Sequence, residues 1–294
     1  MSPLLLALAI AAGAAEHGRV VLTAVAGGGW ASDPFVGAGL GGGPMIELGP
    51  GARLDLSFSP RLKVAIAGDL SLLRFNGADF GSLAARAGAE ARLIGKRAEL
   101  SLALSGDRAE FSRPVPFSDL AAAPPVTSTG AVALASALRL RSGPVALRAA
   151  AAASYRTSEA GEDVAERGLG LDAAVEWPVL RRLVLLAGAR HDRVASARPD
   201  FARVSTGGEV ALTATALEEP ALDLAVRGQL DRVSFDTGVR ETLSRFAVDV
   251  AHPVGPVEAV VAWSWTRSDA GVAGAASRYL VYAGVRGRAR ALSW

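Results

Sequence analysis

The residues of this chain that could act chemically are few, and they form no known catalytic or metal-binding pattern. The sequence has no cysteine, which excludes thiolate zinc sites, cysteine nucleophiles and disulfide scaffolds. Its three histidines, His17, His191 and His252, lie far apart, so no metal site and no cofactor is implied. No HExxH, GxSxG or phosphate-loop motif occurs.

One hydrolytic arrangement can still be drawn from the sequence. His191 has Asp192 beside it, and Ser154 or Ser205 could supply a nucleophile. Such a serine must lie within hydrogen-bond reach of the histidine, which needs a third group to orient it. Sequence spacing places neither serine there, so we expect a protein that is not an enzyme and keep a surface lipid hydrolase as an alternative.

Charged side chains are far more numerous than these catalytic candidates, and they recur at every second position of long segments. In residues 83–93, Arg86, Glu90 and Arg92 alternate with leucine and alanine. The chain has 31 Lys+Arg against 29 Asp+Glu, a net charge of +2, so no polyanion such as a nucleic acid is implied as partner. A two-residue period sends polar and apolar side chains to opposite faces of a β-strand.

The elements that must position these charges are therefore strands of about ten residues or more, long enough to cross a bilayer at a tilt. We count about fourteen, with twelve or sixteen as alternatives if weak segments drop out or the Gly-rich stretch 36–50 pairs as an extra hairpin. The expected strands are 18–31, 50–58, 61–74, 81–94, 97–110, 129–141, 144–156, 167–178, 181–194, 204–217, 221–235, 242–252, 256–267 and 277–291.

The connections between these strands alternate between short and long. Short turns rich in Gly, Pro and Ser occur at positions such as 59–60, 95–96, 142–144 and 253–256, where such residues supply turn dihedrals. Longer polar links lie near 31–50, 75–81, 111–128, 157–167, 195–203, 236–241 and 268–276. The links 31–50 and 111–128 are our candidates for a loop that folds inward.

The N-terminus is typical of an export signal. Residues 4–12 form the apolar run LLLALAIAA, and Ala12-Gly13-Ala14 supplies a small-residue cleavage pattern. We therefore expect residues 1–15 to be a signal peptide and residues 16–294 to be one domain.

Aromatic residues cluster near the expected strand ends, where amphipathic rings form girdles at the two membrane interfaces. Phe58 and Trp177 lie beside short turns. The residues at the other end are Phe75, Phe80, Phe111, Tyr155, Phe235, Trp263, Trp265 and Tyr279.

In these features, over residues 16–294, the chain resembles bacterial outer-membrane β-barrel proteins, although no subfamily can be named. The resemblance implies an all-β, transmembrane, antiparallel up-and-down barrel in the bacterial outer membrane, with lipid and the barrel-assembly machinery as partners. Members of this family end in an aromatic residue that the machinery reads, and Leu292 and Trp294 match that signal. Because Arg286, Arg288 and Arg290 alternate on the opposite parity from Val285, an outward Leu292 and Trp294 require a bulge or a short tail after the last strand.

The polar parity should line the lumen, and its charges separate along the strand order. Residues 81–156 contribute mainly arginines, residues 167–252 mainly carboxylates, and the last strand adds further arginines. We expect the lumen or selectivity residues to be Arg86, Arg92, Arg139, Arg141, Arg148, Arg156, Asp172, Glu176, Glu209, Asp223, Asp231, Asp249, Arg286, Arg288 and Arg290.

Two interpretations of these charges are open. Opposed basic and acidic walls would screen solutes in a porin-like pore. Alternatively, the charges pair across strands and fill a narrow barrel. We therefore expect a passive channel or export pore for small polar or charged solutes. The alternatives are a plugged structural or assembly barrel serving a secretion or envelope apparatus, and the lipid hydrolase. The sequence does not determine the oligomeric state.

Overall fold

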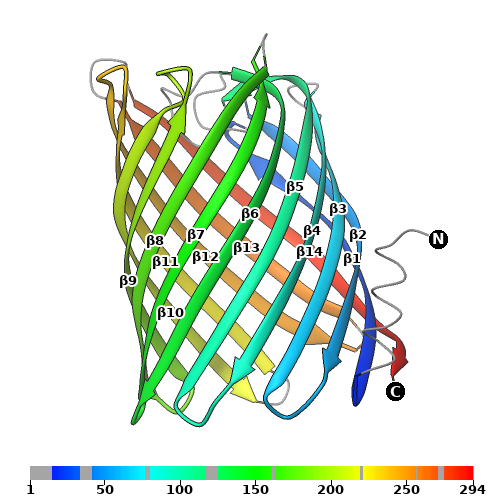
Figure 1. Cartoon of the computed structure of the whole chain (residues 1–294). Coiled ribbons are helices and arrows are strands. Elements are labelled where there is room, and N and C mark those ends of the chain that lie inside the picture. The colour runs from blue at the N-terminus through cyan, green and yellow to red at the C-terminus, as the bar shows by residue number, and fades with distance from the viewer. Residues whose placement is uncertain are drawn as a thin grey trace, which may run out of the picture.

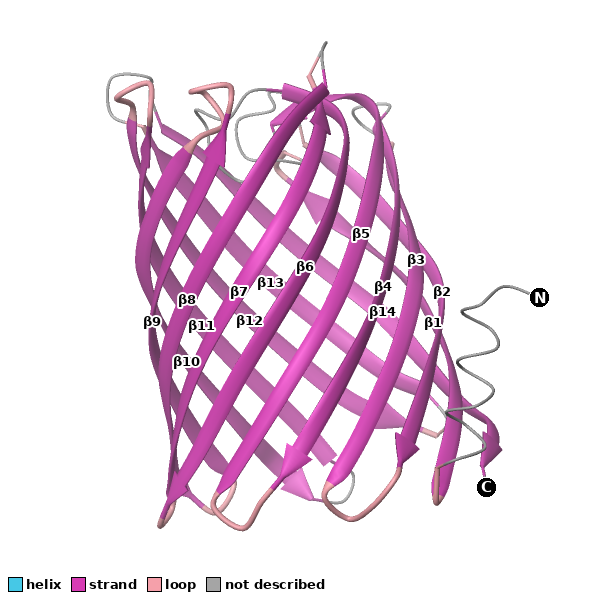
Figure 2. Ribbon diagram, viewed as in Figure 1, coloured by secondary structure: helices cyan, strands magenta, loops and turns pink. Residues whose placement is uncertain are grey.

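The computed structural model describes residues 15–33, 42–76, 80–116, 125–160, 163–218, 221–255, 257–270 and 275–293, and their only regular elements are strands (Figures 1 and 2). The strands are β1 His17–Ala31, β2 Gly43–Ser57, β3 Leu62–Phe75, β4 Phe80–Ile94, β5 Ala98–Pro116, β6 Pro125–Ser142, β7 Val145–Glu159, β8 Asp163–Leu180, β9 Leu183–Ser196, β10 Arg203–Glu218, β11 Ala221–Phe235, β12 Arg240–Val254, β13 Val257–Asp269 and β14 Ala275–Ser293. No helix in these ranges combines the length and the apolarity that a membrane span needs.

The strands form a closed barrel in which each pairs antiparallel with its sequence neighbours, and β1 pairs with β14. Closure removes the two free edges that an open sheet would expose, so the strand backbones find their hydrogen-bond partners within the barrel. The strands are strongly tilted, and β1 begins at the end of the barrel where β14 finishes (Figure 1). That end also carries the short turns, and we call the other the long-loop end.

The prediction of about fourteen strands is confirmed, and the main differences lie in two long links. β2 begins at Gly43, because Gly43 to Pro50 continue the pairing with β1 up to Ala31. This stretch therefore lengthens a strand and forms no extra hairpin in residues 42–57. β5 and β6 likewise extend to Pro116 and from Pro125, well into the expected link 111–128. The rest of both links lies outside the described residues.

The short turns are closed by residues suited to them. Gly143 and Gly255 each have a φ of 61°, a left-handed conformation that glycine adopts without a Cβ clash. In the turn between β2 and β3, the Ser59 hydroxyl accepts hydrogen bonds from the backbone N–H groups of Arg61 (3.2 Å) and Leu62 (3.0 Å). These contacts fix the register of the hairpins at this end.

The two faces of the barrel wall follow the alternation in the sequence. Large apolar side chains are exposed on the outside, for example Leu102 (53 %), Leu134 (50 %) and Leu169 (67 %). The residues that alternate with them point into the barrel. Such an outer belt is compatible with hydrocarbon and would be unfavourable in water, as expected for a transmembrane barrel.

The expected bulge is present where β14 meets β1. Val21 pairs with Arg290, but the next partners are Val20 and Leu292, so the register shifts by one residue on β14. Leu292 consequently lies on the same face as Val20 and is 64 % exposed. Trp294 and residues 1–14 of the expected signal peptide lie outside the described residues.

The prediction of an aromatic girdle at the long-loop end is only partly correct. Tyr155, Trp263 and Tyr279 are exposed on the outward face, as is Trp177 at the other end, all between 37 and 50 %. Phe75 (2 %), Phe80 (1 %) and Phe235 (5 %) are instead buried, and Phe111 packs beside them. These rings lie on the inward parity of their strands, so they line the lumen and do not contact lipid headgroups.

We predict that Gly29→Ala weakens the seam between β1 and β14. A methyl group on Gly29 would collide with the backbone carbonyl oxygen of Val281, which cannot move without disturbing the pairing. The free energy of unfolding, measured by denaturant titration in detergent micelles, should fall by about 1–3 kcal/mol. Gly228→Ala is the matched control, because no atom lies within 4 Å of the added methyl group. Equal losses in the two variants would contradict this account.

Candidate functional site

Apart from Arg290, the predicted lumen residues lie on the inward parity of their strands. Most of those on β4 to β12 alternate with outward leucine, alanine or valine. Arg286 and Arg288 line a cavity inside the barrel. The backbone of Arg290 pairs with Val21 on β1, while its side chain lies outside the described part of the structure.

Many of these charges are paired with one another. Arg139 on β6 reaches across β7 and forms an ion pair with Glu176 on β8. On the basic side, Arg92 pairs with Glu90 at 2.6 Å. The Arg286 guanidinium lies 3.4 Å from Glu258. Each wall is therefore partly neutralised locally, as the second interpretation of the lumen charges predicts.

A surplus of each sign nevertheless remains, on the sides that the sequence predicts. Among the described residues, no ion pair within 4 Å involves the inward arginines Arg86, Arg141 and Arg148 on β4, β6 and β7. The same holds for the inward carboxylates of β8 to β12, which are Asp172, Glu209, Asp223 and Asp249. The walls thus keep opposite signs on top of a framework of paired charges.

The most fully built polar site centres on Asp231 of β11, whose side chain is only 1 % exposed. The Arg190 Nε–H donates to Oδ1 at 2.9 Å, and a second Arg190 nitrogen donates to Oδ2 at 2.5 Å. Gln229 donates to Oδ2 at 2.5 Å, and Arg245 approaches within 3.8 Å. Such a two-pronged guanidinium contact is among the stronger polar interactions in proteins. It stabilises a carboxylate that burial would otherwise make unfavourable.

A glycine provides the space for this carboxylate. Gly207 on β10 lies directly opposite Asp231, and a Cβ on Gly207 would collide with Oδ1. The adjacent wall of the lumen holds a cavity of about 270 Å³, to which Gly168, Gly170 and Asp192 also contribute. Because these glycines carry no Cβ to occupy this part of the wall, the polar groups of β9 to β12 can lie against the sheet.

A larger cavity of about 1120 Å³ occupies the lumen beside β1 to β4 and β14. Its charged lining contains more cations than carboxylates: Arg19, Arg53, Lys63, Arg86, Arg92, Arg286 and Arg288, against Glu47, Asp55, Asp69 and Glu90. Four of these arginines belong to the predicted set. Arg19, Arg53 and Lys63 were not in it, although the alternation in 52–58 and 61–72 places Arg53 and Lys63 on the inward parity.

Toward the long loops, large apolar side chains join the polar ones on the lumen wall. Two clusters line its wall, and together we call them the apolar layer: Ala31, Met45, Phe75, Phe80 and Val115 in one, and Val126, Val164, Phe201, Val233, Phe235 and Leu243 in the other. Phe111 packs against both and stacks on Phe80, with ring centroids 6.4 Å apart. Apolar side chains thus gather on the lumen wall at this end, beside buried polar residues such as Glu166 and Ser268.

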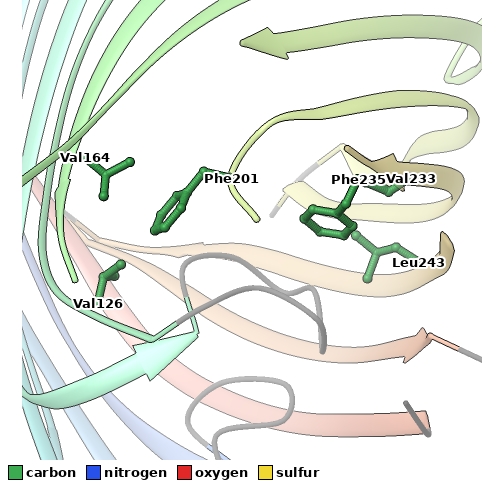
Figure 3. Packing of buried hydrophobic residues seen from close by; sticks show 6 residues of the cluster. All are labelled: Val126, Val164, Phe201, Val233, Phe235 and Leu243. Carbon is green, nitrogen blue, oxygen red and sulfur yellow. The ribbon is translucent and has the colours of Figure 1, made fainter. Parts of the chain in front are cut away.

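Phe201 is the member of the layer that a loop supplies. It belongs to residues 197–202, which connect β9 and β10, and it is fully buried. Figure 3 shows its ring pointing toward Val126 and Val164, with Phe235 and Leu243 on its other side. Among the described connections, the one that folds inward is thus 197–202. The described parts of the predicted candidates 31–50 and 111–128 are largely strand.

The loop is held in this position by polar contacts. Arg198 binds both carboxylate oxygens of Asp200, at 3.1 and 2.5 Å, and its guanidinium carbon lies 5.0 Å from the centre of the Phe201 ring. These hydrogen bonds lower the pKa of the Asp200 carboxyl below its ordinary value, so the contact persists at neutral pH. Arg203 donates to the Phe201 carbonyl at 2.8 Å and pairs at 2.8 Å with Glu166, which is 2 % exposed.

The residues of the hydrolase hypothesis are separated. His191 points outward, and its Nδ1 lies 2.9 Å from the Thr206 hydroxyl oxygen. Ser154, Asp192 and Ser205 line the cavity inside the barrel, on the opposite face of the sheet from His191. The described structure therefore brings neither serine to the histidine.

Comparison with known proteins places the fold. No protein-family model and no curated protein matches the sequence. The deltaS2 mutant of the TodX monoaromatic hydrocarbon channel is similar in structure with a TM-score of 0.56 and 9 % identity, over 93 % of this chain and 90 % of that one. OmpT of Vibrio cholerae has a TM-score of 0.54 and 7 % identity, over 92 % of this chain and 98 % of that one. CdiB from Acinetobacter baumannii has a TM-score of 0.52 and 8 % identity, over 92 % of this chain and 60 % of that one.

The chain has the fold of a bacterial outer-membrane β-barrel. Identities this low establish the fold alone. The apolar outer belt agrees with that fold, and together they place this barrel in a bacterial outer membrane, as the sequence predicted.

We predict that Asp231→Asn destabilises the barrel, because it leaves the Arg190 guanidinium without its charged partner. Arg190 is 35 % exposed, which moderates the loss, so the free energy of unfolding should fall by about 1–3 kcal/mol. Denaturant titration of the refolded protein measures this change. Asp249→Asn, an inward carboxylate with no ion pair among the described residues, should cost clearly less. A result in which both variants behave alike would show that the Asp231 contacts are not stabilising.

Proposed function

We propose that this barrel is a passive channel for small polar or charged solutes, and that its wider part favours anions. The observation that carries the proposal is the cavity of about 1120 Å³ in the lumen, whose lining is rich in arginine. A barrel built only as a scaffold would be expected to fill its lumen with packed side chains.

The charge arrangement supports a selective channel. Cations outnumber carboxylates in the lining of the large cavity, while unpaired carboxylates lie across the lumen on β8 to β12. Charges on low-dielectric walls concentrate ions of opposite sign, and rings of arginine or lysine are typical of pores for anions. Paired charges and a surplus of one sign occur on the same walls, so the two interpretations of the sequence are compatible.

The apolar layer would then act as the barrier at the long-loop end. A hydrated ion passing Phe201 and its neighbours must lose water or wait until the layer opens, and apolar constrictions are known to gate by dewetting. In this proposal the charged cavity selects the solute, and the apolar layer limits how fast it passes.

One of the similar structures is described as a monoaromatic hydrocarbon channel, which supports transport as the class of function. The charged lining of the cavity in this chain favours a polar solute over a hydrocarbon. The proposal includes no catalytic step, and lipid turnover is the assay for the hydrolase alternative.

The same apolar layer favours a second candidate, a plugged barrel that serves as an anchor or as a partner of an envelope apparatus. If the layer does not open, the protein conducts nothing and the charges serve stability alone. Recognition of Leu292 and Trp294 by the assembly machinery is part of both candidates and does not distinguish them.

We predict that the purified, refolded protein conducts ions in planar bilayers, and that Arg141→Glu combined with Arg148→Glu reduces its preference for anions. Both arginines point into the lumen without an ion pair among the described residues, so reversal replaces two positive charges by two negative ones. The chloride-to-potassium permeability ratio, from reversal potentials in a salt gradient, should fall by about threefold or more. Arg61→Glu, in the turn between β2 and β3, is the control that changes charge outside the lumen. The absence of any conductance in the wild-type protein would refute the channel.

We predict that Phe201→Ala increases single-channel conductance, because it removes the ring that the loop inserts into the apolar layer. The wild type and the variant are compared in the same bilayer at the same voltage. If neither protein conducts ions, although heat-modifiable gel mobility shows that the variant is folded, the plugged barrel is the better account. The outward Phe246→Ala, which removes a ring of the same size from the lipid face, should leave conductance unchanged.

A further inference from the structure

The outward face of the barrel has an unusual polar region at the long-loop end of β11 to β13. Arg232 directly follows Asp231, which is buried on the lumen side. Since consecutive side chains of a strand point to opposite faces, Arg232 points outward. Arg240 likewise precedes the buried Glu241. Arg267 lies between the buried Thr266 and Ser268 and is 50 % exposed.

The strand register brings these arginines into one groove of about 760 Å³. Arg232 pairs with Thr242, which pairs in turn with Asp269. In the neighbouring rows Ser244 pairs with Arg267, and Ser234 pairs with Arg240. Three guanidinium groups therefore share a groove with three hydroxyl groups, where most of the outer wall carries leucine, valine and alanine.

The groove is lined by three arginines against two carboxylates, the buried Glu241 and the outward Asp269, so its own residues leave a net positive charge. Asp269 lies 3.5 Å from Arg267, a long and half-exposed contact. Among the described residues, no ion pair within 4 Å involves Arg232 or Arg240. Arginine on the lipid-facing side of a barrel is costly near the bilayer midplane and tolerated only close to the interface. A position near the interface with an anionic partner would offset that cost.

Outward positive charge is confined to the same end elsewhere on the outer wall. The other outward arginines in the described strands, Arg74, Arg108, Arg167 and Arg193, also lie toward the long-loop end. Most outward positions near the short turns are leucine, valine or alanine, with Trp177 and His252 as exceptions, and no arginine or lysine of the described strands is among them. The two membrane interfaces of this barrel therefore differ in charge, and the basic one carries the long loops.

Outer-membrane barrels carry their long loops on the extracellular side. We propose that the groove of β11 to β13, at this end, binds the headgroup of an outer-leaflet lipid that carries more than one phosphate. Guanidinium groups form two parallel hydrogen bonds with phosphate, and hydroxyl groups supply further donors to its oxygens. Trp265, which also lines the groove, is a residue that prefers the level of the headgroups. Because its arginines and hydroxyl groups lie on the outward parity of their strands, the groove faces the surroundings of the barrel, and a membrane component is the occupant we infer.

The test uses the full refolded chain in detergent micelles, with bis-phosphorylated lipid A as the probe and native mass spectrometry as the measurement. The variant is Arg232→Gln with Arg240→Gln and Arg267→Gln, which removes three charge-assisted contacts. Its affinity for the probe should be about tenfold or more below that of the wild type. Arg108→Gln is the matched control, because Arg108 is outward at the same end but is paired with Glu110 at 3.0 Å, outside the groove.

Phosphate dependence is measured with monophosphorylated lipid A, which should bind the wild type clearly more weakly than the bis-phosphorylated form. Equal binding of the two lipids, or equal binding of the probe by the wild type and the triple variant, would overturn the proposal. Displacement of the lipid by millimolar inorganic phosphate would overturn it as well, since the site would then select a free ion. Heat-modifiable gel mobility confirms folding, and Arg240→Gln alone, at the first residue of its strand, provides a milder variant with an expected loss of about threefold.

Discussion

The structure depends on one requirement, that the strand backbones be hydrogen-bonded where the surroundings offer no water. The pairing of β1 with β14 meets it, because it joins the first and last strands and leaves no free edge. The seam is built from small residues: Gly27 pairs with Gly284, and Gly29 lies where a side chain would meet the opposite backbone. Once the ring is closed, the alternation of each strand has a fixed meaning, lipid on one side and lumen on the other.

Closure also determines how the charges can be used. Charged side chains on the inward parity share one lumen, so their free energy depends on partners from strands that are distant in sequence. Asp231 illustrates this: it is buried against Arg190, approached by Arg245, and accommodated by the absence of a side chain at Gly207. Pairs of this kind hold the wall in shape, and the charges left over on each side give the lumen its field.

The long-loop end departs from the simple pattern in two ways. On the inside, apolar side chains gather on the face toward the lumen, and the loop 197–202 adds Phe201 to that layer. On the outside, the lipid parity becomes basic, with Arg232 and Arg267 facing outward beside Trp265. Both departures reduce the agreement between sequence pattern and strand environment, as is usual where a fold carries function. They make this end of the barrel the part in which permeation and lipid contact are expected to be controlled.

The sequence by itself determined the strand count, the two faces and the inward position of the candidate arginines and carboxylates, because a two-residue period has one geometric consequence in a strand. It also implied the bulge before Leu292, from a change of parity. The parity of Phe75 and Phe235 already pointed inward, but their place at strand ends suggested a girdle. Only the tertiary structure decided which charges pair, where cavities remain and that residues 197–202 turn into the lumen. These depend on contacts between strands far apart in the chain, such as Arg203 with Glu166, and local periodicity carries no information about them.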